Sequence, residues 1–521
     1  MGKKIKASKC RSFSLTSGKP SKVKFNFEGS EIPSIANEEQ KFLGRILFYN
    51  GKSEECFSLL KETIQTKLEN LNKTSIRNEY KLEIYQMYIL PSLRFLLTVH
   101  DLPQSYLLKL DTMTDQYIKS WAGLPRSATN NIIHLSTAMN IKKISTLYTE
   151  AHSVTHCSTR LKGDRLVNSV LDNKLQRESN LQRKHSITVT AENYYQTAVN
   201  RNMVQGEIPG ITPEGEISES SHSYLTLSGG DIQSKATAKF IEDVKTDVKS
   251  LVQINETEKM LNHVQNLIKQ GKYLELCQLE KTDATWQGYI YNLPRGTMKF
   301  LLNSTIDTLP TKVNLKLWGK VSSDKCRCGS RQTLNHILNC CGPSLREGRY
   351  TFSHDNVLSY IGKCLNKQKY TCYIDLEGSQ TSAGGTIPPN LVVTTLKPDI
   401  VIIDKSSKTA TIFELTIPAE HRIKIAHELE FQKYQHFMSD IKSHTVKVTP
   451  FEIGSHTGYI STENKRSIHS LHKFCANNIT LKKFIQNLSA ITVLSSYYIF
   501  NARNQENWES LETIHAPFKN N

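Results

Sequence analysis

The sequence predicts an α+β protein built from several domains, and three observations lead to this prediction. Apolar residues recur at spacings of three and four through most of residues 54–308, which is typical of helices. A dense group of cysteines and a histidine follows at 326–341. Two β-branched runs within 399–415 then flank a short polar loop and precede an amphipathic helix. With 521 residues, the chain is long enough for two to four domains.

The composition favours a nucleic-acid partner. The net charge is +17 and the mean hydropathy is −0.42, so the chain is polar and strongly basic. A polyanion such as DNA or RNA is the leading explanation, and an anionic membrane surface is the alternative. No apolar run approaches the roughly 18–20 residues of a membrane span, and the basic start lacks the apolar segment of a signal peptide. Eleven cysteines, several isolated, fit a reducing compartment, and a nucleic-acid role makes the nucleus the expected location.

The first half of the chain is predicted to pass from short strands to helices. Residues 8–50 alternate β-branched and aromatic residues with turns, and the helical pattern begins near residue 54. Pro91 is expected to end one helix, and Gly123 followed by Leu-Pro another. Ser, Thr, Asn and Gly then dominate, which predicts a linker or weakly ordered insertion. The predicted segments are 1–53, 54–174 (helical), 175–234 (linker or insertion), 235–308 (helical connector), 309–345 and 346–521.

The cysteine-rich segment predicts a structural zinc site. Cys326 and Cys328 are separated by one residue, and Gly329 follows as a turn that lets them converge. His336 lies eight residues after Cys328 and supplies an imidazole nitrogen as the third ligand. Either Cys340 or Cys341 completes a set of three thiolates and one imidazole, and the spacing leaves both open.

The segment 399–415 predicts a hairpin that places two carboxylates opposite each other. If Asp404 pairs with Thr409 across the loop, counting outward along the strands pairs Asp399 with Glu414. Directly opposed side chains lie roughly 5 Å apart at Cβ, so the two acids would repel each other. Because Mg²⁺ takes hard oxygen ligands, a Mg²⁺ or Mn²⁺ ion that bridges the two carboxylates would offset their repulsion.

The helix after the hairpin is predicted to direct two charges at the sheet. Its apolar stripe includes Ile423, Leu429 and Tyr434, and Glu430 and Lys433 fall within the same arc. A lysine beside a metal-bound pair of acids can orient a water or stabilise a pentavalent phosphorane. The alternative is an ordinary amphipathic helix in which the lysine lies at the edge of the stripe and extends to solvent.

Several motifs together resemble the C-terminal part of the reverse transcriptase polyprotein of a non-LTR retrotransposon of the type with a restriction-like endonuclease. The cysteine-rich segment is similar to the zinc knuckle of these elements, and residues 349–358 are similar to the helix that opens their nuclease. The motifs that carry the resemblance are Phe42-Leu43-Gly44 (primer grip), Trp121 with Leu124-Pro125 (thumb), Cys326, Cys328, His336 and Cys341, Lys397-Pro398-Asp399, Glu414 with Thr416, Lys433, and Pro450–Gly454 (closing strand).

The resemblance implies a fold and a function for each segment. Residues 1–53 would be the end of the polymerase palm, 54–174 the helical thumb, 309–345 the zinc knuckle with Cys341 as fourth ligand, and 346–521 an α/β restriction-endonuclease-like PD-(D/E)XK domain. It implies metal-dependent nicking of target DNA, with Asp399 and Glu414 as Mg²⁺ ligands and Lys433 as the catalytic lysine. DNA is the implied partner, with the element's RNA as a further candidate.

The sequence also departs from the family pattern. No Asp-Asp dipeptide occurs, so the polymerase site is expected to be missing and the chain to be a truncated copy. Ser353 stands where an arginine is usual, and Glu430 stands where the first of two lysines often lies. The alternatives are therefore a nucleic-acid-binding remnant without catalysis, or a genomic relic that gives no stable protein.

Overall fold

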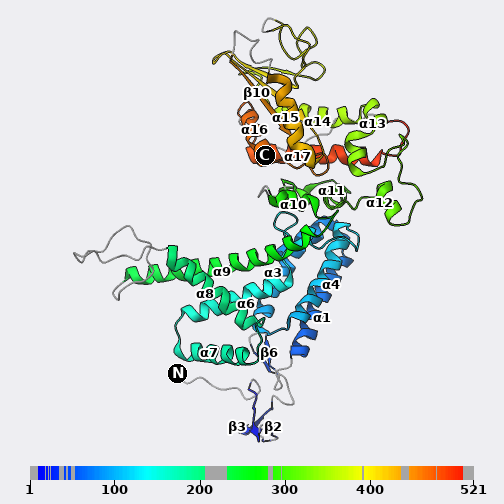
Figure 1. Ribbon diagram of the computed structural model, residues 1–521. Helices are drawn as coiled ribbons and strands as arrows, with labels where there is room; N and C mark the ends of the chain where they lie inside the picture. Colours follow the sequence, from blue (N-terminus) through cyan, green and yellow to red (C-terminus); the bar gives the residue numbers. More distant parts are fainter. Residues whose placement is uncertain are drawn as a thin grey trace, which may run out of the picture. The chain divides into compact units, whose positions relative to one another are not determined.

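The computed structural model describes residues 10–17, 19–21, 23, 25–34, 40–42, 45–47, 53–205, 231–279, 285–294, 296–389, 392–435, 445–476 and 478–508. The protein is α+β: helices make up most of it, and one four-stranded mixed sheet lies in its C-terminal part (Figure 1). The chain divides into two compact units, residues 1–118 with 141–259 and residues 119–140 with 260–521. This division departs from the predicted segments, because residues 119–140 group with the C-terminal half.

The N-terminal strands are short and paired as three separate two-stranded ladders. They agree with the short strands and turns expected over residues 8–50, and β5 and β6 pair as a hairpin. Leu43 and Gly44 of the primer-grip motif lie outside the described residues. The strands are β1 (Leu15–Thr16), β2 (Lys19–Pro20), β3 (Phe25–Phe27), β4 (Ser30–Ile32), β5 (Gln40–Phe42) and β6 (Arg45–Leu47).

Helices form the rest of the first unit, as the spacing of apolar residues predicts. Pro91 does not end its helix: a π turn, η2 (Tyr85–Ile89), leads directly into α3 (Leu90–Val99), where Pro91 lies in the first turn. Since proline lacks an N–H, it is tolerated at such a start. The remaining helices are α1 (Ser53–Lys73), α2 (Asn78–Ile84), α4 (Gln104–Ala122, continuing into the second unit), α6 (Ile144–Leu161), α7 (Arg165–Asn180), α8 (Ile187–Gln205) and α9 (Asp231–Gln265, also continuing into the second unit).

The predicted linker at 175–234 is wrong for its first thirty residues. Helix α7 continues to Asn180, and α8 packs closely on α6. Ala198 of α8 is fully buried with Cys157 of α6 and Val244 of α9, and Tyr194 packs against the same cluster. Burial of this apolar face of α8 stabilises the helix, although the polar composition of the segment does not indicate a stable helix. Residues 206–230 lie outside the described part of the chain.

The second unit begins with short helices around the cysteine-rich segment. Helix α4 ends as predicted at Gly123, which adopts a left-handed conformation with φ +66° while Leu124 N donates to Lys119 O. The elements are α5 (Asn131–His134), α10 (Lys272–Leu279), η3 (Thr285–Gly288), η4 (Ile290–Asn292), α11 (Thr297–Thr305), α12 (Lys312–Leu317), η5 (His336–Cys340) and α13 (Gly342–Arg346).

The sheet has the strand order β10-β9-β8-β7 and helices on both faces. Strands β7 and β9 are antiparallel to β8, and β10 is parallel to β9. One face packs on α14, α16 and α17 through a core that includes Phe413, Leu415 and Phe451. The other face packs on α15 through Ile412 and Tyr434. The elements are β7 (Thr371–Ile374), β8 (Ile400–Asp404), β9 (Thr409–Thr416), β10 (Thr445–Glu452), α14 (Arg349–Cys364), η6 (Glu420–Arg422), α15 (Ile423–Gln435), α16 (Thr462–His472) and α17 (Leu481–Asn501).

Candidate metal centre and acidic site

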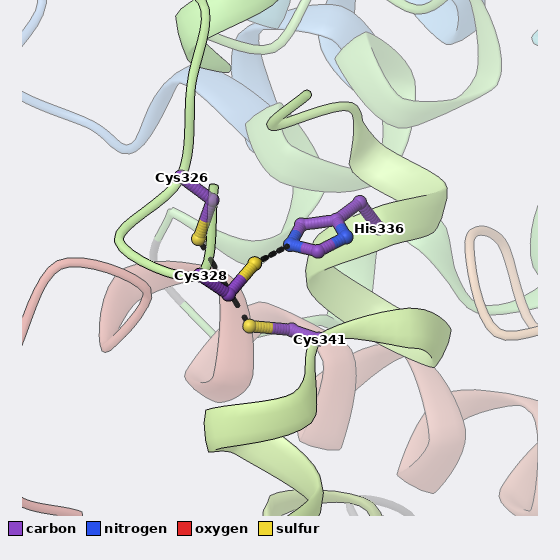
Figure 2. A group of neighbouring side chains, drawn as sticks. All are labelled: Cys326, Cys328, His336 and Cys341. Carbon is purple, nitrogen blue, oxygen red and sulfur yellow. Dashed lines mark hydrogen bonds between the residues drawn. The ribbon is translucent and has the colours of Figure 1, made fainter. Parts of the chain in front are cut away.

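Four side chains of the cysteine-rich segment converge on one point. Figure 2 shows Cys326, Cys328, His336 and Cys341 pointing toward one another, and their ligand atoms all lie within 4.8 Å of one another. The Sγ atoms of Cys326 and Cys341 are 3.9 Å apart, and Cys328 Sγ is 3.2 Å from His336 Nε2. Ligands about 2.3 Å from a tetrahedral ion lie roughly 3.8 Å apart. The Cys3His cluster could therefore bind a metal ion such as zinc.

Local turns bring these ligands together. Gly329 has φ +85°, a conformation that disfavours other residues, and Cys326 N donates to Ser330 O across the turn. His336 opens the π turn η5, and Cys341 follows it. Burial lowers the pKa of His336, which favours the neutral imidazole that binds metal.

The π turn decides between the two candidate cysteines. In an α-helix, Cys340 at the fourth position after His336 would share its face. The wider π turn instead brings the fifth position, Cys341, to that face. Cys341 is buried inside the cluster, whereas Cys340 is exposed and accepts a weak hydrogen bond from Asn335.

The predicted hairpin register is confirmed. Asp404 pairs with Thr409 and Ile400 with Phe413, so Asp399, directly before β8, lies opposite Glu414 of β9. The two residues are also linked through the backbone. Asp399 N donates to Glu414 Oε2 (3.1 Å), and Leu415 N donates to Asp399 Oδ2 (2.7 Å). Both side chains are buried, so two carboxylates lie side by side in a largely water-excluded place.

Helix α15 brings the predicted lysine to this pair. Lys433 Nζ lies 2.8 Å from Glu414 Oε1, and the Tyr434 hydroxyl donates to the same oxygen (3.1 Å). Lys433 therefore contacts the sheet as predicted, and Glu430 contacts Lys433 at 3.2 Å. Leu429 was expected in the apolar stripe, but its side chain is 59% exposed, because the helix contacts the sheet with a narrower face.

The electrostatics of the site follow from its burial. Burial, and then the neighbouring Asp399, raise the pKa of Glu414 to about 7, although Lys433 acts in the opposite direction. The pKa of Lys433 is raised: burial lowers it, but the hydrogen bond and charge of Glu414 outweigh burial. The ammonium is therefore charged at neutral pH, and it offsets part of the negative charge of the pair.

His354 is a site residue to which the sequence assigned no role. It comes from α14, and its Nε2 lies 3.3 Å from Asp399 Oδ2 and 3.2 Å from Leu415 O. Burial lowers its pKa, but contacts with Asp355 and Asp399 outweigh this and raise the pKa to about 10. An imidazolium thus faces one acid while Lys433 faces the other. The similarity of residues 349–358 to a nuclease helix was the available signal.

A third acid on the same face of the sheet was also missed. Register places Pro450 beside Glu414 and Glu452 beside Thr416, so Glu452 shares the face of Glu414. Its side chain is fully buried, and His427 Nδ1 of α15 lies 3.1 Å from its Oε2. Burial raises the pKa of Glu452 to about 7, and the His427 charge lowers it only in part. No residue spacing in the sequence indicated this pair.

Ser353 of α14 lines a cavity of about 350 Å³. Its side chain is 5% exposed, and its Oγ has no hydrogen-bond partner among the described residues. The cavity lies beside His354, so it adjoins the acidic site.

Comparison with known proteins adds no identification. Neither protein-family models nor curated proteins give a significant match to the chain. Among the helices that the structure describes, none combines the length and apolar character needed to cross a membrane.

Proposed function

We propose that the chain is the C-terminal part of a retrotransposon protein of the restriction-like-endonuclease type, and that it nicks DNA with a divalent metal ion. The observation that carries the proposal is the arrangement of Asp399, Glu414 and Lys433. Two buried acids are paired across a hairpin, and a lysine from the next helix lies 2.8 Å from one of them. Buried acids without a ligand are costly, and a site of this composition suits Mg²⁺ or Mn²⁺.

The donor set fits such an ion. Asp399 Oδ2 accepts a hydrogen bond from Leu415 N. Among the described residues, no hydrogen bond is donated to Asp399 Oδ1, so this hard oxygen is available to bind a metal ion. Glu414 Oε2 accepts a hydrogen bond from the backbone N–H of Asp399, and Glu414 Oε1 accepts hydrogen bonds from Lys433 Nζ and the Tyr434 hydroxyl. Backbone amides thus fix both carboxylates, which favours a preorganised pair of oxygen ligands.

The protein's residues then have distinct roles in phosphodiester cleavage. A cation held by Asp399 and Glu414 would polarise the scissile phosphate and generate the attacking hydroxide from water. Lys433 would neutralise charge that develops on the phosphorane oxygens, since its ammonium lies at the edge of the pair. His354 would act as a positioning residue, because its ring holds Asp399 Oδ2 through a partly buried ion pair.

The other parts of the chain support the same proposal. The helices at 54–174 would be the thumb, and their basic residues would bind nucleic-acid backbone without sequence preference. The Cys3His cluster would hold Zn²⁺ and fix the segment that precedes the nuclease. The net charge of +17 favours DNA, and the element's RNA, as partners, and such a protein would act in the nucleus.

A nucleic-acid-binding protein without cleavage is the second candidate, and one contact favours it. Glu430 lies 3.2 Å from Lys433, so this lysine is shared between two carboxylates. An ammonium bound to two acids is less available to a phosphate. Ser353, in place of an arginine, removes a further positive charge near the site.

Plasmid nicking by the full-length protein distinguishes the two candidates. We expect supercoiled DNA to be nicked with Mg²⁺ or Mn²⁺, and we expect Asp399→Ala to bind DNA with unchanged affinity but not to nick it. DNA binding without nicking at any metal concentration would leave only the second candidate. Nicking that Asp399→Ala retains would exclude this site as its source.

A further inference from the structure

The cavity beside Ser353 is built from four elements of the second unit. It lies between α14, the end of β9, the π turn η5 and helix α17. Its volume of about 350 Å³ is within the roughly 300–1,000 Å³ typical of small-ligand sites. Its lining residues are Leu338, Asn339, Tyr350, Thr351, Ser353, His354, Leu415, Thr416, Ile417, Ser455, Ser496 and Ile499.

The lining is polar but almost uncharged. His354 is the one basic side chain among the lining residues, so a phosphate would meet a single cation and several hydroxyls. Leu338, Ile417 and Ile499 supply apolar walls. This combination of apolar walls and hydroxyl groups suits a neutral, flat ligand with hydrogen-bonding edges.

Two hydroxyls in the lining are without partners. Within the described chain, Ser353 Oγ and Thr416 Oγ1 are buried and form no hydrogen bond. Both oxygens are almost inaccessible to solvent, so each hydroxyl has to turn toward the cavity before a ligand can bond to it. Such a bond would remove the cost of about 1–3 kcal/mol that a buried polar group without a partner carries. Asn339 is held in place by its hydrogen bond to Ser455 Oγ (2.9 Å), which fixes a third polar group in the lining.

The cavity adjoins the acidic site. Thr416 lies two residues after Glu414 on β9, and His354 both lines the cavity and contacts Asp399 at 3.3 Å. A nucleotide whose phosphate lies at the acids would therefore have its base within reach of the cavity.

We propose that this cavity binds an extrahelical nucleobase of the DNA target, next to the cleaved phosphate. The inference rests on the proposed nuclease function. A base that leaves the stack exposes the hydrogen-bonding edge that Ser353 and Thr416 would contact, while the apolar walls cover its faces. The small size of Ser353 keeps the space open, since a longer side chain at this position would extend into it.

The test uses DNA binding by the zinc-loaded full chain in buffer without Mg²⁺ or Mn²⁺, so that cleavage plays no part and no chelator competes for the structural zinc. One labelled duplex carries a single bulged 2-aminopurine, and a matched duplex carries an abasic bulge. We expect the first to bind at least about tenfold more tightly, because the base contributes contacts that the abasic site lacks. We also expect the fluorescence of 2-aminopurine to change on binding.

Variants tie this preference to the cavity. Ser353→Met fills the space and should bring the two affinities within about twofold, while the abasic duplex binds as before. Thr416→Val removes one hydroxyl with little change of shape and should weaken the preference severalfold, which keeps the test valid if the methionine variant does not fold. Ser359→Met changes a half-buried serine on α14 outside the lining and should leave the preference intact.

Equal affinity of the wild-type protein for both duplexes would overturn the proposal, and so would a preference that Ser353→Met retains. The two proposals can fail separately. Nicking without a base preference rejects only the proposal that the cavity binds a nucleobase. A base preference without nicking rejects the proposed nuclease function and is still consistent with nucleobase binding in the cavity.

Discussion

The Cys3His cluster and the acidic site lie in the same unit but are built in different ways. All ligands of the cluster come from the sixteen residues 326–341 and are oriented by two local turns. The acidic site takes Asp399 and Glu414 from a hairpin, Lys433 from the next helix and His354 from a helix before the sheet. The first site depends on local chain geometry, whereas the second depends on the tertiary fold. Loss of a metal ion should therefore affect stability at the first and activity at the second.

Removal of a cluster ligand has the largest expected effect. Cys341→Ser should abolish zinc binding and destabilise the second unit by several kcal/mol, since a structural zinc site contributes roughly 10–16 kcal/mol. Cys340→Ser is the matched control and should retain the metal, because Cys340 is exposed outside the cluster. Zinc content by atomic emission and the thermal unfolding midpoint measure both effects. Equal zinc loss in the two variants would contradict the assignment of Cys341.

Replacement of the lysine at the acids should affect catalysis without loss of the fold. Lys433→Met is expected to lower the nicking rate by about 10²–10³-fold, because a cation near the developing charge is removed. Lys424→Met alters an exposed lysine on the same helix and should nick at the wild-type rate. Plasmid nicking at saturating Mg²⁺ gives the comparison. The assignment fails if both variants lose activity equally or if neither does.

The buried Glu452 tests the electrostatics of the same face of the sheet. Its pKa is about 7 in the folded protein and about 4.5 when unfolded, so folding favours the protonated form. Its contribution to stability is complete below pH 4.5 and is lost as the pH rises through 7, by up to roughly 3 kcal/mol.

Glu452→Gln should therefore remove this loss. Between pH 5 and pH 8, the unfolding midpoint of the wild-type protein should fall more than that of the variant. Glu377→Gln, at an exposed position after β7, should follow the wild-type protein. Parallel pH profiles for wild type and Glu452→Gln would show that burial does not perturb this acid.

The contact between Glu430 and Lys433 has the smallest expected effect. Glu430→Gln frees the lysine from one of its two carboxylates and should raise the nicking rate by about twofold to fivefold, since a partly exposed ion pair is worth up to about 1 kcal/mol. Glu428→Gln, on the exposed side of α15, is the control. A decrease in Glu430→Gln would mean that Glu430 positions the lysine rather than competing for it.

The sequence predicted what depends on local periodicity. The alternation of β-branched residues around a four-residue loop was enough to pair Asp399 with Glu414, and the helical spacing was enough to place Lys433 beside them. The cysteine spacing predicted the cluster but not its fourth ligand, because η5 is a π turn and helical periodicity assumes 3.6 residues per turn.

What the sequence did not predict depends on tertiary packing. Residues 187–205 were part of a predicted linker or weakly ordered insertion because Ser, Thr, Asn and Gly dominate that segment. Yet Ala191, Tyr194 and Ala198 recur at helical spacing, and Tyr194 and Ala198 pack against α6 and α9. His354 lies 45 residues before Asp399, and Glu452 lies 38 residues after Glu414. Only the fold brings such distant residues to one site.

The central claim is that Asp399 and Glu414 hold one divalent cation between them. Zinc-loaded protein exposed to Fe²⁺, ascorbate and peroxide gives the most direct test, because hydroxyl radicals cut the backbone next to bound iron. We expect cuts near residues 399 and 414 that excess Mg²⁺ and Asp399→Asn both suppress. Cuts confined to 326–341, or cuts near 399 that persist in Asp399→Asn, would contradict the claim.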